Sequence, residues 1–376
     1  MIDGPGPWGS GVFELVEGYS SLRAEIGLVS ANPFVCTWLP THQPRSDRIL
    51  LQANLNHWNR DRGPNVGTIV FRNDVNPAEA LDLVCNTEGE IDIVSEVAPA
   101  DAQKVLDSPH ARLVRVDALR VLTCLINRDA EGVPLGDVRA RRALNMAVNR
   151  GELIQKAFAG YAQPLSGLTA PYQAGVPKGQ QPYPHDPNRA CELLRDAGWP
   201  RSRELRLATL PETEAVAQLL VQQYQKSFGI EVVLTVIPQK EVLAAQHLLV
   251  EKTLPLPFDL LVFPWFDLLA DAPPAVLHRE FYHSTGAFRT GPPVPEFEDL
   301  MNKFATSIDD SLVGYATDID RLVYEQALSV FLCAPQALYA VNNNVTGFEG
   351  YAATFELAET GVNNRHWSTR KPSVRY

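Results

Sequence analysis

The stretch PLGDVRARRALNMAVNR, residues 134–150, contains the clearest helical pattern in the chain. Five of its apolar positions share one face of a helix: Val138, Ala143, Leu144, Ala147 and Val148. This spacing predicts an amphipathic helix over residues 136–148. Arg139, Arg141 and Arg142 are expected mostly outside its apolar face.

Residues suited to helix ends support this prediction and extend it along the chain. Asp137 stands where a carboxylate caps the first turn of the helix just described. Further on, Asp186-Pro187 opens a predicted helix over residues 188–197. Gly198 ends that helix, because a left-handed backbone conformation is easiest for glycine.

Strands and helices alternate on both sides of these segments. The expected strands are residues 12–16, 48–53, 68–72, 90–94, 111–116, 119–126, 205–210, 230–237, 258–263 and 337–341. The other expected helices are residues 78–86, 99–107, 212–228, 240–251 and 313–331. Such alternation favours an α/β architecture with sheets covered by helices. A chain of 376 residues is also too long for one compact core, so two lobes are expected.

Composition narrows the classes of partner. The net charge of −11 argues against nucleic acid, because phosphate binding needs a basic surface. It suits a cationic or amine-bearing ligand, or serves solubility alone. No run of about 18 apolar residues is present, so no membrane-spanning segment is predicted. The five cysteines are scattered without a CxxC pair, and most are expected to be small buried hydrophobes.

No pattern of catalytic residues stands out. A nucleophile elbow, a P-loop, an HExxH motif and a Rossmann fingerprint are all missing from the sequence. His278 and His283 are five residues apart, a poor spacing for two metal ligands on one helical face. The acidic pairs Asp309-Asp310 and Asp318/Asp320 are interpreted as a solvated helix start and face. We therefore expect a protein that is not an enzyme and needs no metal or cofactor.

Six segments in order carry a family resemblance: residues 9–15, 49–58, 89–92, 127–150, 186–199 and 295–300. They resemble the GTGPY/F-x-L, IVLEANPDYW, GEID, DVRVRQAL-AIDR, YDPEKAKALLAEAGY and NPEFDALL motifs of the family 5 extracellular solute-binding proteins. Members of this family are the peptide- and nickel-binding components of bacterial ABC importers. Each segment is weakly specific alone, but their order over most of the chain is specific.

The resemblance implies a class II periplasmic-binding-protein-like fold whose two lobes close on a ligand about a hinge. Residues 1–124 would be a partial lobe I, residues 125–340 lobe III, and residues 341–376 a return to lobe I. Relative to the family the chain looks N-terminally truncated, without the early strands and the second domain. It also carries an insert at residues 19–47, which either covers exposed sheet edges or packs as a surface loop.

The resemblance also implies a function. The protein would bind a peptide or similar small solute in the interlobe cleft and pass it to an ABC permease/ATPase complex. Its location would be periplasmic or otherwise extracytoplasmic. The N-terminus lacks the basic and apolar regions of a signal peptide, which predicts a cytoplasmic location if Met1 is the true start. The alternative is a cytoplasmic ligand-sensing or interaction module that kept the scaffold and lost transport.

Candidate ligand contacts follow from the same resemblance. In peptide-binding members, an acidic residue shortly after a "GW" strand end holds the α-amino group of the ligand. Asp267 and Asp271 match that position here, and each is equally well interpreted as a helix cap or a loop acid. Trp265 either stacks on a ligand side chain or fills the core between the lobes.

Two further residues complete the predicted set. Phe13 lies in the segment that lines the cleft in relatives. Arg289 is a candidate partner for a ligand carboxylate, or an ordinary surface arginine.

Overall fold

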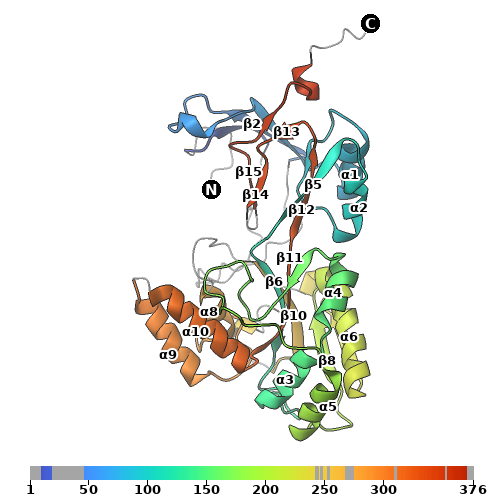
Figure 1. Ribbon diagram of the computed structural model, residues 1–376, viewed down its shortest axis with the longest axis vertical. Helices are drawn as coiled ribbons and strands as arrows, with labels where there is room; N and C mark the ends of the chain where they lie inside the picture. The colour runs from blue at the N-terminus through green and yellow to red at the C-terminus, as the bar shows by residue number, and fades with distance from the viewer. Residues whose placement is uncertain are drawn as a thin grey trace. The chain divides into compact units, whose positions relative to one another are not determined.

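A computed structural model describes residues 10–18, 46–241, 245, 249–251, 255–266, 275–308, 311–351 and 354–370. The chain forms two compact units, one of residues 1–116 with 337–376 and the other of residues 117–336 (Figure 1). The backbone therefore passes from one unit to the other twice, after Val116 and after Gln336. The predicted lobe boundaries at residues 124 and 340 fall inside the strands β6 (Arg120–Ile126) and β12 (Ala337–Asn342).

The second unit is built on a six-stranded mixed sheet. Besides β6, its strands are β7 (Ala162–Pro164), β8 (Leu205–Thr209), β9 (Val232–Val236), β10 (Leu260–Phe266) and β11 (Ser329–Pro335). Their order is β7-β11-β6-β10-β8-β9. Strand β6 runs antiparallel to both of its neighbours, whereas β8 is parallel to β10 and to β9.

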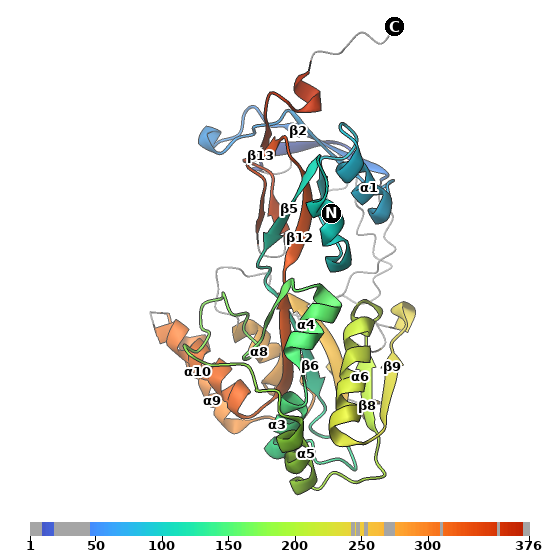
Figure 2. The same ribbon diagram turned by 45° about the vertical axis from the view of Figure 1, so that its right-hand side comes forward.

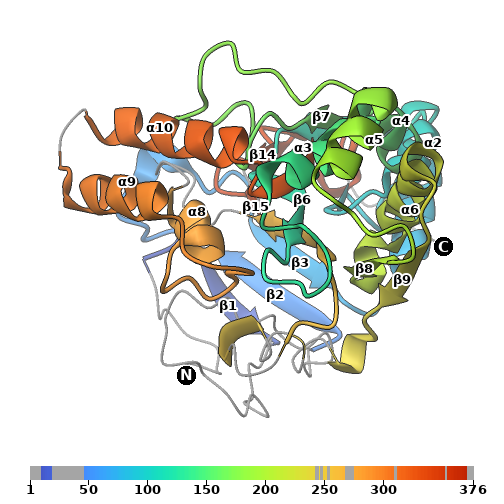
Figure 3. The same ribbon diagram turned by 90° about the horizontal axis from the view of Figure 1, so that it is seen from below.

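Helices cover both faces of this sheet, as Figures 2 and 3 show. One group consists of α3 (Val138–Met146), α4 (Arg150–Phe158), α5 (Pro187–Asp196) and α6 (Glu214–Phe228); the other consists of α8 (Ala275–Tyr282), α9 (Pro295–Thr306) and α10 (Ser311–Glu325). Alternate residues of one strand point to opposite faces, so Leu122, Cys124 and Ile126 join the core under the first group. Phe263 of β10 instead meets Phe281 of α8 on the other face. The α/β fold predicted from the sequence is thus present.

The predicted helix over residues 313–331 is wrong in its second half. Helix α10 ends at Glu325, and Ala327 has a left-handed φ of 47° before β11 begins at Ser329. Every residue of β11 is buried because the strand lies between two neighbours and under both layers of helices. A fully buried strand has no alternating pattern, and its short apolar sequence cannot be told from a buried helix by periodicity.

The motif at residues 134–150 attaches the first group of helices to β11. The side chain of Asn145 is fully buried and bridges to that strand, donating to the Ser329 carbonyl at 2.9 Å and accepting from the Phe331 N–H at 3.1 Å. Arg150, 5% exposed, donates from Nε to the Phe331 carbonyl at 2.7 Å. These side chains hydrogen-bond the backbone of a strand that is distant in the sequence.

Arg141 corrects one expectation. It was placed mostly outside the apolar face, but only 4% of it is exposed. Its guanidinium donates to the carbonyls of Leu135 and Gly136 at 3.1 and 2.7 Å and to Gln326 at 2.8 and 3.0 Å. Helical spacing places a charged residue such as Arg141 on the solvent face of the helix. It cannot show that backbone carbonyls lie close enough to accept hydrogen bonds from its guanidinium.

The described residues of the first unit form four small sheets: β1 (Phe13–Glu17), β2 (Arg48–Ala53) and β3 (Thr68–Arg72); β4 (Ile93–Val94), β12 and β5 (Ala111–Val116); β13 (Val345–Thr346) and β16 (Gly361–Val362); and β14 (Glu349–Tyr351) and β15 (Thr354–Glu356). Helices α1 (Pro77–Asn86) and α2 (Ala102–Leu106) pack against the sheet of β12. Asn76 caps α1 by accepting from the Glu79 N–H at 2.9 Å. The strand expected at residues 90–94 is reduced to β4.

Short 3₁₀ turns complete the described chain: η1 (Arg60–Arg62), η2 (Pro99–Asp101), η3 (Pro211–Thr213), η4 (Gln239–Glu241) and η5 (Trp367–Thr369). Helices α4, α8 and α9, strand β7 and the small strands β13 to β16 were not expected from the sequence. Most of the expected helix at residues 240–251 and of the insert at residues 19–47 lies outside the described residues.

The cysteines largely follow expectation. Cys85, Cys124 and Cys333 are buried and free, while Cys191 on α5 is exposed. Cys36 lies outside the described residues. Burial raises the pKa of the Cys124 and Cys333 thiols far above the usual range, so both remain neutral.

Candidate functional site

The carboxyl end of β10 carries an aromatic cluster. The Trp265 ring meets Phe281 and Phe288 edge-on, with ring centroids 5.4 and 5.6 Å apart. Phe263, two residues earlier on the same face, lies 6.2 Å from Trp265. The indole is 8% exposed, so most of its surface contributes to the core beneath this end of the strand.

One polar atom of this cluster has no partner. The Nε1–H of Trp265 is buried and makes no hydrogen bond within the described structure. A buried donor without an acceptor costs about 1–3 kcal/mol, and tryptophan N–H groups usually find a partner. The ring of Trp265 therefore contributes to packing, while its N–H remains available to an acceptor that the described residues do not supply.

The two predicted carboxylates, Asp267 and Asp271, lie outside the described residues. The described chain reaches Phe266, which is paired with Arg120 at the start of β6. Asp267 directly follows Phe266 in the sequence. The edge of the sheet where β10 finishes is therefore also the edge where the chain enters the second unit.

Polar side chains gather at this same edge. The Asp117 carboxylate accepts from the amide groups of Gln336 at 2.8 Å and Gln163 at 3.2 Å. The Tyr172 hydroxyl donates to the Ala118 carbonyl. Burial, reinforced by the charge of Asp117, raises the pKa of Tyr172 far above its usual value and keeps this donor protonated. No local sequence pattern connects Asp117 with Gln163 or Gln336, which are distant from it in the sequence.

A hollow of about 470 Å³ adjoins this polar edge. It is bordered by β7 and the long loop after it, with Gln163, Gln173, Gln180 and Lys178 among its lining residues. Its other walls are mainly proline rings. The hollow therefore combines glutamine amides and one lysine with an apolar surface.

Comparison with known proteins decides the family. The sequence profile of the bacterial extracellular solute-binding proteins, family 5 Middle, matches residues 28–287. The chain belongs to this family. Glutathione-binding protein GsiB of Salmonella choleraesuis is 37% identical over 98 residues, which are 26% of this chain and 19% of GsiB. The aligned segment thus spans less than a fifth of that relative.

Solved structures support the fold. AppA from Clostridium difficile has a TM-score of 0.77 at 19% identity, covering 95% of this chain and 68% of that protein. The oligopeptide-binding protein AppA from Bacillus subtilis, solved with a nonapeptide, has a TM-score of 0.64 at 19% identity. That match covers 86% of this chain and 65% of that protein. These matches confirm the expected periplasmic-binding-protein-like architecture.

Arg289, another predicted contact of this family 5 protein, does not lie at the end of β10 that carries Trp265. Arg289 follows Phe288 and lies beside Arg128, which comes just after the end of β6. Because β6 and β10 are antiparallel, that is the opposite edge of the sheet from Phe266. Phe13 belongs to the first unit, where it pairs with Ala53 and is half-buried.

The acidic face expected on α10 is only partly solvated. Asp318 is exposed and pairs with Arg321, but Asp320 has no exposed surface. Its Oδ1 accepts from the N–H groups of Leu168 and Thr169 at 3.1 and 3.2 Å and lies 2.9 Å from His278 Nε2. Asp320 thus holds the loop after β7 in place, and the expectation of a solvated face was wrong there.

The two histidines considered as metal ligands have other partners. The carboxylate beside His278 is that of Asp320, and His283 Nε2 lies 2.9 Å from Glu298 Oε2. Across the described ranges no group of three or more potential ligands is arranged to hold a metal ion. Among these same residues no helix is long and apolar enough to cross a membrane.

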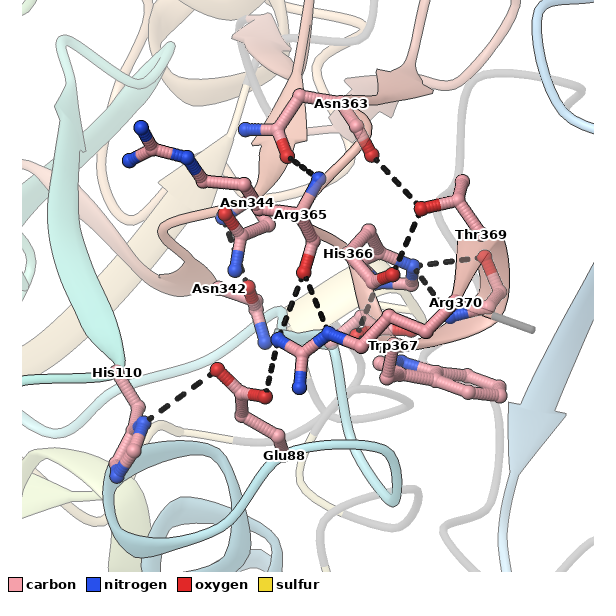
Figure 4. A network of polar contacts seen from close by, with 12 residues as sticks. Glu88, His110, Asn342, Asn344, Asn363, Arg365, His366, Trp367, Thr369 and Arg370 are labelled. Carbon is pink, nitrogen blue, oxygen red and sulfur yellow. Dashed lines mark hydrogen bonds and ion pairs between the residues drawn. The ribbon is translucent and has the colours of Figure 1, made fainter. Parts of the chain in front are cut away.

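The family motif at residues 89–92 holds the C-terminal segment, residues 363–370. Asp92 Oδ1 accepts from Trp367 Nε1 at 3.0 Å and lies 2.9 Å from His366 Nε2. The Ser368 N–H donates to His366 Nδ1, so Nδ1 is the acceptor and Nε2 carries the proton directed at Asp92. Arg370 also pairs with Glu88 at 2.7 Å (Figure 4). Here the motif performs a structural task.

Proposed function

We propose that this family 5 protein binds a short peptide or peptide-like solute and delivers it to the membrane complex of an ABC importer. Glutathione is the first candidate, because the relative GsiB is named for binding it. The observation that supports binding at the end of β10 is the unpartnered indole N–H of Trp265, two residues before Asp267. A ligand carbonyl or carboxylate oxygen would accept this hydrogen bond.

The proposed roles follow from the chemistry of a peptide. Asp267 or Asp271 pairs with the α-amino group, because an ammonium removed from water needs a carboxylate partner. The similarity to the oligopeptide-binding protein AppA from Bacillus subtilis, solved with a nonapeptide, supports this class of ligand. Glutamine amides such as Gln163, in the hollow beside Asp117, are suited to further main-chain groups of the ligand.

Ligand-dependent melting tests the binding proposal. Glutathione, peptides of two to five residues and metal chelates are added separately, and the melting temperature is followed. A true ligand at a hundred times its dissociation constant stabilises the fold by about 2.7 kcal/mol. If no peptide shifts the melting temperature, the proposed ligand class is wrong.

Matched carboxylate variants test the site. Asp267→Asn and Asp271→Asn are compared with Asp318→Asn, which removes an exposed carboxylate from α10. Loss of the carboxylate proposed to pair with the ligand's α-amino group is expected to weaken peptide affinity at least tenfold in one of the first two variants, with no change in the control. Unchanged affinity in both would refute the assignment of the amine-binding carboxylate.

Uptake measurements test the transport role. Cells that lack this protein are expected to accumulate less of the labelled solute identified by melting, and the wild-type gene should restore uptake. Equal uptake with and without the protein, despite tight binding in solution, would contradict delivery to an importer.

A further inference from the structure

Arg128 and Arg289 of the second unit lie in backbone segments that are fixed by hydrogen bonds. The Arg128 N–H donates to the Thr290 carbonyl at 2.8 Å, and the Thr290 hydroxyl donates to the Ile126 carbonyl at 2.8 Å. Phe288, the residue before Arg289, donates its backbone N–H to the Glu280 carbonyl at 2.9 Å. The turn at Arg289 is thereby fixed to the end of β6, and the side chains start from defined positions.

The guanidinium of Arg128 is enclosed without being hydrogen-bonded. Only 9% of Arg128 is exposed. Its Nη2 is buried, and this atom has no hydrogen-bond partner in the described structure. The backbone of Gly291, with a φ of 156°, passes directly against it. A Cβ added to this glycine would lie 2.6 Å from the Arg128 Cβ and 3.0 Å from its Nε. The close approach therefore requires glycine at this position.

The hydrogen bonding of the Arg289 guanidinium is also incomplete. Its Nη1 donates to the Gly291 carbonyl, but its Nε is buried and has no partner. Neither Arg128 nor Arg289 forms an ion pair with a carboxylate of the described ranges. Burial lowers the pKa of Arg128, and the neighbouring charge of Arg289 lowers it further, while Tyr282 and Asp129 act in the opposite direction.

Other buried arginines in the same unit show that this arrangement is specific. The guanidinium of Arg141 donates hydrogen bonds to three different backbone carbonyls, and that of Arg150 also donates to backbone carbonyls. Arg206 also has an unused Nε but pairs with the Asp259 carboxylate at 2.9 Å. Among the described residues, Arg128 lacks both kinds of compensation, and its neighbour Arg289 has only the Gly291 carbonyl as a partner.

We propose that Arg128 and Arg289 together bind a small oxyanion, such as a carboxylate, phosphate or sulfate group. Guanidinium groups present planar N–H donors that match the oxygens of these anions, and charge-assisted bonds are the strongest of the common hydrogen bonds. An anion would also compensate the buried Arg128 cation and the buried Nε of Arg289, a residue that is itself half-buried. The site is distinct from the proposed peptide site, because it lies at the opposite edge of the sheet.

Phosphate titration tests this proposal. The melting temperature of the wild-type protein is measured against sodium phosphate, with sodium chloride at matched ionic strength as the reference. The comparison is necessary because kosmotropic salts stabilise proteins by exclusion from their surface. The proposal expects a saturable rise with phosphate above the chloride reference, confirmed by calorimetric titration. A rise that never saturates, or none beyond chloride, would overturn it.

Variants locate the effect. Arg289→Gln should weaken phosphate binding at least tenfold, whereas Arg321→Gln, an exposed arginine on α10, should leave it unchanged. Asp129→Asn should leave binding equal or tighter, because it removes a nearby negative charge. Equal phosphate binding in Arg289→Gln and the wild type would refute the site. If Asp129→Asn destabilises the protein and abolishes the phosphate effect, Asp129 itself is involved and the site is wrong as proposed.

Competition distinguishes the two sources of the oxyanion. Acetate and glutathione are titrated with phosphate present at its half-saturating concentration. Displacement of phosphate by either compound supports the site and assigns it to organic carboxylates. Failure of both to compete, with saturable phosphate binding retained, supports the site and assigns it to an inorganic anion. The phosphate result does not depend on whether Asp267 or Asp271 binds a peptide.

Discussion

Arg150→Met is expected to destabilise the second unit substantially. The Arg150 guanidinium donates to the carbonyls of Phe331 at 2.7 Å, Asn145 and Tyr183 at 3.1 Å and Val148 at 3.4 Å, and to the Asn145 side-chain oxygen at 3.1 Å. The structure describes no carboxylate in an ion pair with it. Its stabilising effect therefore comes from the planar arrangement of its donors, which join α4 to β11.

The magnitude follows from two opposing contributions. Burial lowers the pKa of Arg150 to about 10. A shift of that size corresponds to about 3 kcal/mol of penalty for keeping the cation buried, and methionine removes this penalty. Against it, each buried carbonyl left without its donor costs about 1–3 kcal/mol. With four carbonyls affected and incomplete additivity, we expect a net loss of about 2–4 kcal/mol in the free energy of unfolding.

Urea denaturation followed by far-ultraviolet circular dichroism measures this loss. Arg142→Met is the matched control, because Arg142 is exposed in the same motif and donates to one carbonyl, that of Glu325. It should cost less than about 1 kcal/mol. Arg150→Lys should be at least as destabilising as Arg150→Met, since it keeps a buried charge and loses the planar donors. Full stability in Arg150→Lys, or a loss in Arg150→Met no greater than in the control, would refute the reasoning.

Three further perturbations follow from single carboxylates. Asp137→Ala removes a helix cap and should cost about 1 kcal/mol. Because hydrogen bonding to Arg139 lowers the pKa of Asp137, its contribution should be present above the ordinary carboxyl pKa of 3.8 and disappear as the pH falls through the lowered value, as acid titration of the variant difference can show. Asp320→Ala should cost roughly 3 kcal/mol in thermal unfolding, because it leaves buried donors unpaired, whereas Asp318→Ala should change stability by less than about 0.5 kcal/mol. Asp92→Ala should release the C-terminal segment, which hydrogen exchange would detect as faster exchange there; unchanged protection would contradict the role of Asp92.

Much of the fold could be predicted from local sequence patterns. The bounds expected for β2, β3 and β5 agree with the structure, because these strands are bordered by turn residues. The roles predicted for Asp137 and Asp186 at helix starts also hold, with each side chain accepting from a backbone N–H in the first turn. Caps and turns depend on interactions within a few residues, which the sequence records directly.

The candidate site was less predictable for a physical reason. Trp265 was identified by resemblance. That its ring is packed while its N–H has no partner in the described structure depends on its surroundings, which include Phe281 and Phe288 from outside its strand. Asp117 acquires its partners Gln163 and Gln336 only when β7 and β11 are brought alongside β6. Neither arrangement has a signature in local spacing.

The sequence by itself determined the family, the alternation of strands and helices and most helix ends, because these depend on residue order and short-range geometry. Only the tertiary structure decided which polar groups are buried and what they bind. Arg141 and Asp320 occupy helical positions that local spacing assigns to solvent, yet neighbouring segments cover both. Arg128 and Arg289 likewise become a pair only because Thr290 is hydrogen-bonded to the end of β6. Burial and hydrogen-bond partners depend on segments that are distant in sequence, so they emerge only when the chain is folded.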